Sequence, residues 1–437
     1  MTDTRWYAFS CIITVLLLAA CTASKKGLFT KKTAHEAYAA RITDAGLQQT
    51  ALGNAWFTAA QKALARPLTV TLPYKETGYF AAEKPDAAGF MFSARRGERI
   101  DIAVSAQPGG RFLLFADLWQ LNTGTGDPTL LGAADTTTWQ LRHEVEKDGR
   151  FVLRLQPELL RGGNYTVTIT TAPTLAFPVP SKTRSRIGSF WGDARDQGGR
   201  KHEGIDIFGT FRTPVVAAAN GYISRVGLNN LGGKVIFMQP EGKDYTLYYA
   251  HLDSQLVRSG QQVMTGDTLG LMGNTGNAKN TPTHLHFGIY TTGGAMDPMP
   301  FVNVNRTAPA VISADTALLH NNVRNKMAVS LRSSPAANGT LITKLPANQV
   351  MQVLAATDKW YKVLLPDNRE GFVESVTLSA EPYRSITIKN ASALLAIPDS
   401  ITAVQTTIPA GASIRILGAY NDYDFVRFEA FNGWIKR

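Results

Sequence analysis

The chain has 437 residues and a formal net charge of +11, with 44% hydrophobic and 18% charged residues. This length exceeds what one hydrophobic core usually supports, so several domains are expected. The ordinary balance of apolar and charged residues excludes a chain that is disordered throughout. The positive charge favours polyanionic partners, but no basic run with interleaved aromatic residues occurs, so no nucleic-acid partner is expected.

The first residues have the pattern of an export signal. Arg5 precedes an apolar run from Trp6 to Ala20, which is too short to span a bilayer comfortably and suits a signal peptide. The run ends in small residues before Cys21, which resembles the lipobox of bacterial lipoproteins, where the cysteine is acylated. A plain signal peptide or a buried free cysteine is the alternative. Residues 1–20 are therefore predicted to be a lipoprotein signal peptide and Cys21 a lipid anchor in a membrane.

Residues 21–66 are predicted to be a basic tether followed by helices. Apolar residues recur at three- and four-residue steps from Thr33 to Leu64, with Gly46 and Gly53 as interruptions and Pro67 after the end.

Residues 67–176 change to the period of a strand. Apolar residues alternate with polar ones in several short runs, and glycine-rich turns separate these runs. Such a series predicts a β-sandwich.

Four of the seven histidines lie between residues 202 and 286. They belong to three strings, which are His202-Glu203-Gly204-Ile205-Asp206, Tyr249-Ala250-His251-Leu252 and His284-Leu285-His286-Phe287. The other three, His35, His143 and His320, are predicted to be structural, because a lone histidine usually is.

The spacing of these histidines predicts a metal site. His284 and His286 are two apart in an apolar run, so on a strand they share one face, and one imidazole can hold a metal while the other stands beside its open position. The glycine between His202 and Asp206 favours a bend into a strand, which lets both side chains converge on one ion. Two imidazoles and a carboxylate suit catalytic zinc with water as the fourth ligand.

The three strings, H-x-G-x-D, Y-x-H-L and H-L-H-F in this order, resemble those of the lysostaphin-type (LytM-like) zinc endopeptidases of bacterial cell walls. The resemblance covers residues 177–303 and implies an antiparallel sheet that floors a groove, with walls at residues 228–233 and 274–282. It also implies the site residues: one Zn²⁺ per chain bound by His202, Asp206 and His286, and catalytic histidines His251 and His284, acting as base and transition-state stabiliser. Degenerate relatives that only activate other hydrolases usually lose ligands, and this chain keeps them all.

Residues beyond 325 repeat a pattern. Trp360 lines up with Tyr423, Val363 with Val426, and Gly371-Phe372-Val373 with Gly433-Trp434-Ile435. Each copy, at 326–380 and 386–437, resembles a bacterial SH3-like domain. Such domains commonly bind cell-wall peptides, and a role as a spacer or packing module is equally open.

The sequence thus predicts a mainly β, multidomain chain: the helical segment, an accessory β-sandwich, a zinc endopeptidase domain at 177–310 and two SH3-like β-barrels. The predicted function is hydrolysis of peptide cross-links of peptidoglycan, with its stem peptides as substrate. A non-catalytic envelope regulator or a wall-binding scaffold that activates another hydrolase is the alternative. The predicted location is the cell envelope, with the lipid anchor in the outer membrane facing the periplasm, because Thr22 and not Asp follows Cys21.

Overall fold

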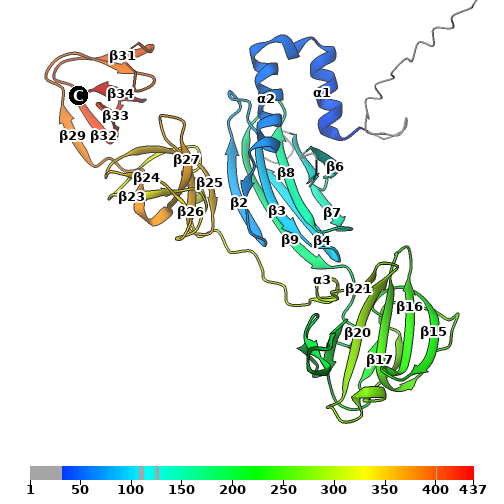
Figure 1. Cartoon of the computed structure of the whole chain (residues 1–437). Coiled ribbons are helices and arrows are strands. Elements are labelled where there is room, and N and C mark those ends of the chain that lie inside the picture. The colour runs from blue at the N-terminus through cyan, green and yellow to red at the C-terminus, as the bar shows by residue number, and fades with distance from the viewer. Residues whose placement is uncertain (1–31, 108–112, 123, 125–126, 400) are drawn as a thin grey trace, which may run out of the picture.

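In a computed structural model, residues 32–437 are described, apart from 108–112, 123, 125–126 and 400 (Figure 1). The chain is mainly β, as predicted, and its strands form several separate sheets. Both Cys21 and the predicted signal peptide lie outside the described residues. Within the described part of the chain, no helix combines the length and apolar character needed to cross a membrane.

A helical hairpin packs on the sandwich and consists of α1 (Ala34–Asp44) and α2 (Ala51–Ala65). The chain turns at Gly46, which adopts a left-handed conformation with φ 71°. The expected interruption at Gly53 is wrong, because Gly53 lies inside α2. A Cβ atom on Gly53 would stand 2.0 Å from the carbonyl oxygen of Leu47, so this glycine permits the close approach of α2 to the preceding turn.

The β-sandwich consists of two sheets that enclose one apolar core. Their orders are β1-β3-β8-β5-β6 and β2-β9-β4-β7. Fully buried residues of both sheets, such as Ile100, Leu153 and Val167, meet between them. The strands are β1 (Leu68–Thr69), β2 (Tyr74–Phe80), β3 (Ala88–Ala94), β4 (Glu98–Gln107), β5 (Leu114–Leu121), β6 (Pro128–Ala133), β7 (Gln140–Glu144), β8 (Gly149–Pro157) and β9 (Gly163–Pro173).

Residues 177–303, named here the motif domain because they carry the histidine strings, form one antiparallel sheet of order β10-β13-β20-β17-β16-β15-β18. Strands β14 and β19 pair with each other at its side, and β19 also pairs with β17. The elements are β10 (Arg186–Ser189), β11 (Ala194–Arg195), β12 (Arg200–Lys201), β13 (Ile205–Phe208), β14 (Pro214–Val216), β15 (Gly221–Asn229), β16 (Gly233–Pro240), β17 (Thr246–Gln255), β18 (Gln262–Val263), β19 (Thr268–Met272), β20 (His284–Thr291), β21 (Gly294–Met296) and α3 (Met299–Val302).

Two C-terminal units share one strand order. In the first unit the strands lie side by side in the order β22-β25-β26-β27-β23-β24. In the second unit the corresponding strands lie in the order β29-β32-β33-β34-β30-β31. The strands are β22 (Asn322–Asn325), β23 (Val329–Arg332), β24 (Leu341–Leu345), β25 (Val350–Thr357), β26 (Trp360–Leu364), β27 (Glu370–Glu374), β28 (Leu378–Ser379), β29 (Arg384–Thr387), β30 (Ser392–Leu395), β31 (Val404–Ile408), β32 (Ser413–Tyr420), β33 (Tyr423–Phe428) and β34 (Phe431–Lys436).

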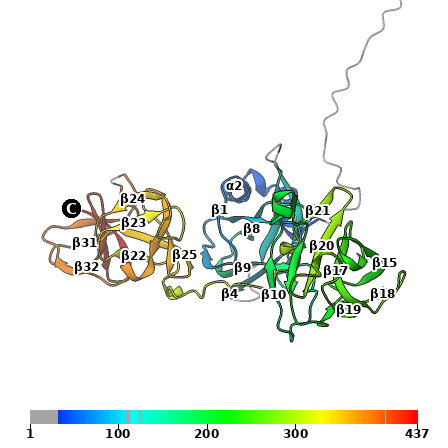
Figure 2. The ribbon, with the colours of Figure 1, turned by 60° about the horizontal axis from the view of Figure 1, so that its bottom comes forward.

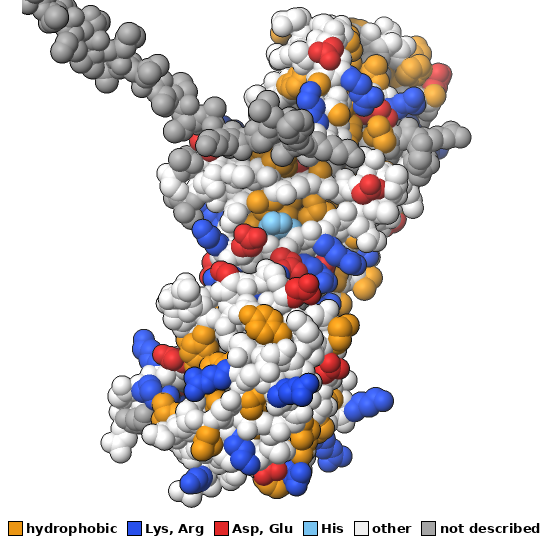
Figure 3. All heavy atoms as spheres, turned by 90° about the vertical axis from the view of Figure 1, so that its right-hand side faces the viewer, with side chains coloured by type: hydrophobic (Ala, Val, Ile, Leu, Met, Phe, Trp, Pro, Cys, Tyr) orange, Lys and Arg blue, Asp and Glu red, His pale blue; other side chains and the backbone are white. Residues whose placement is uncertain are grey.

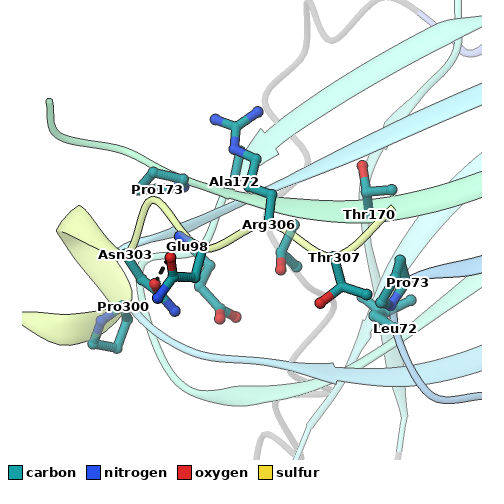
Figure 4. Close-up of a pocket in the computed structure, with 12 residues that line it drawn as sticks. Leu72, Pro73, Glu98, Thr170, Ala172, Pro173, Pro300, Asn303, Arg306 and Thr307 are labelled. Carbon is teal, nitrogen blue, oxygen red and sulfur yellow. Dashed lines mark hydrogen bonds between the residues drawn. The ribbon is translucent and has the colours of Figure 1, made fainter. Parts of the chain in front are cut away.

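The sandwich lies between the C-terminal units and the motif domain (Figures 1 and 2). Strand β2 of the sandwich pairs with β25, where Thr77 faces Ala356 and Gly78 faces Ala355, so one sheet continues into the first C-terminal unit. The chain reaches that unit through residues 303–307, which run beside β9 and enclose a crevice of about 190 Å³ with it (Figure 4).

The junction between the sandwich and the motif domain is packed at the end of the sheet where β16 finishes and β17 begins. Phe301 is buried at 3% exposure and stacks edge-on against Tyr245. A Cβ on Gly97 of the sandwich would stand 2.4 Å from the Phe301 ring, so the ring touches the sandwich backbone. Across the same junction, Arg96 donates to Asp244 over 2.7 Å.

We expect Phe301→Ala to loosen this junction. The substitution removes a buried ring, and such changes cost about 3–5 kcal/mol. Differential scanning calorimetry of the full-length protein should show an earlier thermal transition. The control is Phe431→Ala, because Phe431 is 47% exposed and its loss should leave the transition in place. An unchanged transition for Phe301→Ala would contradict a packed junction.

Candidate metal centre and active site

The pairing of β13 with β20 brings the predicted site residues together. In this antiparallel pair Asp206 lies opposite His286, and Phe208 lies opposite His284. Side chains alternate along a strand, so these four share the outer face of the sheet. The residues between them, Ile205, Ile207, Leu285 and Phe287, have no exposed surface and form the core on the other face.

Three donor atoms converge on one point above this face. The Nε2 of His202 lies 3.1 Å from Oδ1 of Asp206 and 3.0 Å from Nδ1 of His286. The Nδ1 of His286 lies 3.1 Å from the same Oδ1. A tetrahedral zinc ion with ligand bonds of about 2.0–2.1 Å separates its ligands by about 3.3 Å. The donor set and its spacing therefore fit zinc after a small expansion of the triangle.

The surroundings prepare these groups to donate lone pairs. Nδ1 of His202 lies 2.8 Å from the carbonyl oxygen of Phe190, which accepts its proton and leaves Nε2 free to face the other ligands. Burial lowers the pKa of His286, which favours its neutral form. Burial opposes ionisation of Asp206, but the adjacent imidazoles of His202 and His286 outweigh it and hold the Asp206 pKa well below its usual range.

His251 and His284 stand beside the donor triangle in matching orientations. The Nδ1 of His251 lies 2.8 Å from the carbonyl oxygen of Thr275, and the Nδ1 of His284 lies 2.8 Å from that of Pro282. In each ring the Nδ1 proton is therefore donated to the backbone, so Nε2 carries the lone pair. The Nε2 of His284 is 3.9 Å from Oδ1 of Asp206, and the two rings lie 4.9 Å apart.

An irregularity in β17 turns His251 toward this site. Leu247, Tyr249 and Leu252 are all buried in the core, so the alternation shifts by one residue between the last two. The pairing of β16 with β17 shifts register at the same place. His251 itself has a left-handed φ of 63°, which is uncommon for a residue other than glycine. The bulge therefore re-aims His251 away from the core, as bulges beside active sites commonly do.

The site opens into a groove of about 830 Å³. Its walls include Asn229 to Gly232 on one side and Asn277, Ala278, Thr281 and Pro282 on the other, which lie within the predicted wall loops. Among the described residues, everything that lines the groove lies between 189 and 290. No described part of the sandwich or of the C-terminal units covers the metal donors, so an extended chain has access to them.

Arg195 holds the candidate metal donor Asp206 in place, and it lies outside the three histidine strings from which the site was predicted. Its Nη2 donates to Oδ2 of Asp206 over 2.7 Å and to the hydroxyl of Ser189 over 2.6 Å. The Ser189 hydroxyl lies 3.3 Å from Nδ1 of His202 and donates to Asp193 over 2.9 Å. Because Oδ2 of Asp206 is occupied by Arg195, Oδ1 is the oxygen left for the metal.

Further groove residues were also missed by the motif analysis. Phe208, Phe237, Tyr248 and Tyr290 line the groove. Tyr248 shares the outer face of β17 with Ala250, so strand alternation was the available signal. The neighbouring Tyr249 is fully buried in the core, and its hydroxyl accepts from the amide of Ala218.

The histidines that were predicted to be structural lie outside the groove lining. His35 stacks on Trp56 with ring centroids 4.7 Å apart. His320 packs against Tyr79 at 4.3 Å, and His143 against Phe151 at 6.3 Å.

Comparison with known protein families assigns two regions of the chain. Residues 200–298 match peptidase family M23, and residues 328–379 match the bacterial SH3 domain. The chain therefore contains an M23 peptidase domain and a bacterial SH3 domain, as the resemblance predicted.

Individual relatives are similar over the motif domain. The L-Ala–D-Glu endopeptidase of Bacillus subtilis is 37% identical over 137 residues, which is 29% of this chain and 42% of that protein. The murein hydrolase activator NlpD of Salmonella dublin is 34% identical over 143 residues, covering 32% and 34%. The solved catalytic domain of lysostaphin from Staphylococcus simulans is 31% identical, with 27% and 91% covered and a TM-score of 0.25. The chain spans less than half the length of these curated relatives.

We expect Arg195→Ala to weaken metal binding about 10- to 100-fold, the usual effect of removing a group that orients a metal ligand. Zinc affinity of the purified full-length protein would be measured by competition with a chromogenic chelator. Arg212→Ala is the matched control, because Arg212 is exposed and pairs with Asp253 outside the donor triangle. Equal zinc affinity for Arg195→Ala and the wild type would show that the bond to Asp206 does not support the metal.

Proposed function

We propose that this protein is a zinc-dependent endopeptidase that hydrolyses peptide cross-links of bacterial peptidoglycan. One observation carries the proposal. Three metal donors and two histidines with inward lone pairs stand together in a groove that no described part of the other domains covers. The match to peptidase family M23 and the similarity to a cell-wall endopeptidase support the reaction class.

Each site residue has a distinct role in this proposal. His202, Asp206 and His286 would hold the ion, and zinc in such a site supplies Lewis acidity toward a peptide carbonyl and an attacking water. Burial lowers the pKa of His251 to about 4, against the opposing hydrogen bond to Thr275, so His251 is neutral at neutral pH and can accept a proton. His284, across the site, is the residue proposed to stabilise charge that develops on the carbonyl oxygen, a role that requires a proton on its Nε2.

The rest of the chain suits action in the cell envelope. Lys and Arg side chains are spread over the lower part of the molecule in Figure 3, where the motif domain lies, with fewer Asp and Glu among them. Such a surface favours anionic wall polymers. We further propose that the SH3-like pair binds wall peptides. Acylation of Cys21 would anchor the protein to the outer membrane on its periplasmic side.

A second candidate function is activation of another cell-wall hydrolase without catalysis. The similarity to a murein hydrolase activator favours it. The complete donor triangle and the two oriented histidines favour catalysis instead, because an activator needs none of these five groups in working geometry.

Digestion of purified peptidoglycan tests the proposed reaction. We expect the zinc-loaded protein to remove cross-linked dimers from the product profile seen by mass spectrometry, and a chelator to prevent this. Re-addition of zinc should restore the activity. An unchanged wall with zinc confirmed in place would favour the activator function, which stimulation of a purified wall amidase would then test.

His284→Ala should lower the rate of hydrolysis about 10²- to 10³-fold, the usual effect of removing a group that stabilises the developing oxyanion. Zinc should remain bound, because His284 is not one of the three donors. Metal content by mass spectrometry and hydrolysis of a soluble cross-linked peptide would be measured on the same sample. His143→Ala serves as the control, since His143 lies on β7 of the sandwich. Hydrolysis that survives His284→Ala would remove His284 from the catalytic machinery.

A further inference from the structure

The backbone of His251 is held by a hydrogen bond whose acceptor lies in a wall of the groove. His251 has a left-handed φ of 63°, and its amide donates to the carbonyl oxygen of Gly232 over 2.7 Å. A left-handed conformation is disfavoured for a residue with a Cβ atom, so it persists only where neighbouring groups hold it. The direction of the Gly232 carbonyl therefore helps to determine where the His251 imidazole points.

Gly232 does not set this direction by itself. Glycine has no Cβ atom and populates a wide range of backbone angles. A Cβ atom at this position would stand 2.0 Å from the Tyr248 hydroxyl, so the close approach of the wall to β17 requires glycine here. The direction of the Gly232 carbonyl must therefore come from the groups that bind the neighbouring peptide unit.

Both polar groups of the peptide unit between Leu231 and Gly232 are bound. The carbonyl oxygen of Leu231 accepts from the amide of Asn277 in the other wall over 3.0 Å. The amide of Gly232 donates to Oδ1 of Asn229 over 2.6 Å, which closes the turn after β15. Asparagine side chains commonly bind nearby backbone amides in this way. Because a peptide unit is planar, the two bonds fix the plane from which the Gly232 carbonyl continues.

The carboxamide of Asn229 also reaches β17. Its Nδ2 donates to the Tyr248 hydroxyl over 3.3 Å. The bond to the Gly232 amide assigns the orientation of the carboxamide, because an N–H group can donate only to the oxygen. Asn229 itself is exposed, and no hydrogen bond joins its side chain to a described metal donor. Asn229 therefore acts on the site only through the turn and through β17.

We propose that Asn229 is a positioning residue for His251. Its carboxamide fixes the turn whose Gly232 carbonyl holds the His251 backbone, and this directs the His251 imidazole toward the metal donors. The consequence for catalysis rests on the proposed function, since the direction of the ring matters for hydrolysis only if His251 accepts a proton. The effect of Asn229 on the imidazole can be measured without hydrolysis.

Nitrogen NMR of the histidine rings in the zinc-loaded, full-length protein measures this effect. The signals of His251 would be assigned by their loss in His251→Ala. We expect Asn229→Ala to shift the ring signals of His251 and to leave those of His284 in place. His284 is the internal reference, because its amide donates to Gly273 and its imidazole to Pro282, and neither acceptor belongs to the turn.

Two further variants separate positioning from a general disturbance of the fold. Asn229→Asp should return the His251 signals toward those of the wild type, because a carboxylate oxygen can still accept from the Gly232 amide. Asn220→Ala is the matched control and should leave the signals in place. Asn220 is also exposed and accepts from a backbone amide, that of Thr265 over 2.9 Å, but it does not line the groove.

Hydrolysis of a soluble cross-linked peptide measures the catalytic consequence. We expect Asn229→Ala to lower kcat about 10- to 100-fold with little change in KM, because a misplacement of about 1 Å can cost that much. The zinc content should equal that of the wild type. In a His251→Ala background the same substitution should cause no further loss, since the group that Asn229 positions is gone.

Unchanged His251 signals in Asn229→Ala would overturn the proposal. Equal shifts of the His251 and His284 signals would also overturn it, and so would a further loss of kcat in the His251→Ala background. Failure of the proposed function is distinguishable from these results. If the shift is confined to His251 but the wild type hydrolyses no peptide, the positioning role stands and the proposed catalytic function fails.

Discussion

The register between β13 and β20 is the constraint on which the site depends. It places Asp206 opposite His286 and turns both, with His284, to the outer face. A slip by one residue would move these polar groups into the core and expose Ile207 and Phe287. Burying an ionised carboxylate without a partner is far more costly than burying a side chain such as Phe287 is favourable. Burial of the apolar side chains therefore sets the register of β13 against β20. This register alone places the candidate metal donors together on the opposite face of the sheet.

The placement of His251, the other proposed catalytic histidine, depends on a local departure from regular strand pairing. The bulge in β17 gives His251 its left-handed backbone, and the amide of His251 donates to the carbonyl oxygen of Gly232 over 2.7 Å. Thr275 joins the same assembly, because its hydroxyl accepts from the amide of Lys234 while its carbonyl holds the imidazole of His251. The two walls of the groove are thus tied to each other and to His251. An altered wall conformation would change both the width of the groove and the direction of this imidazole.

The sequence predicted the groups that carry chemistry far better than the groups that position them. His202, Asp206 and His286 stand in short strings whose residue types and spacing already indicate metal ligands, and the structure brings them within ligand distance. Arg195 acts through a contact between β11 and β13 that depends on the path of a loop, so its residue type carries no signal by itself. The pairing of β2 with β25 joins segments nearly 280 residues apart, and backbone pairing at an open sheet edge leaves little trace in side-chain pattern.

The candidate metal donors and the aromatic residues of the groove share neighbouring strands. The outer face of β20 carries His284, His286, Gly288 and Tyr290 in order, so a proposed catalytic histidine, a candidate metal donor and an aromatic residue of the groove stand on one strand. Near Tyr245 the same sheet is held against the sandwich through Phe301, whereas no described residue of another domain lines the groove. A rigid sheet fixed at one end and open at the other suits a polymer that cannot diffuse into a closed site. In the proposed function a wall strand comes to the groove, so no other domain can lie over the metal donors, and no described residue of the sandwich or of the C-terminal units lines the groove.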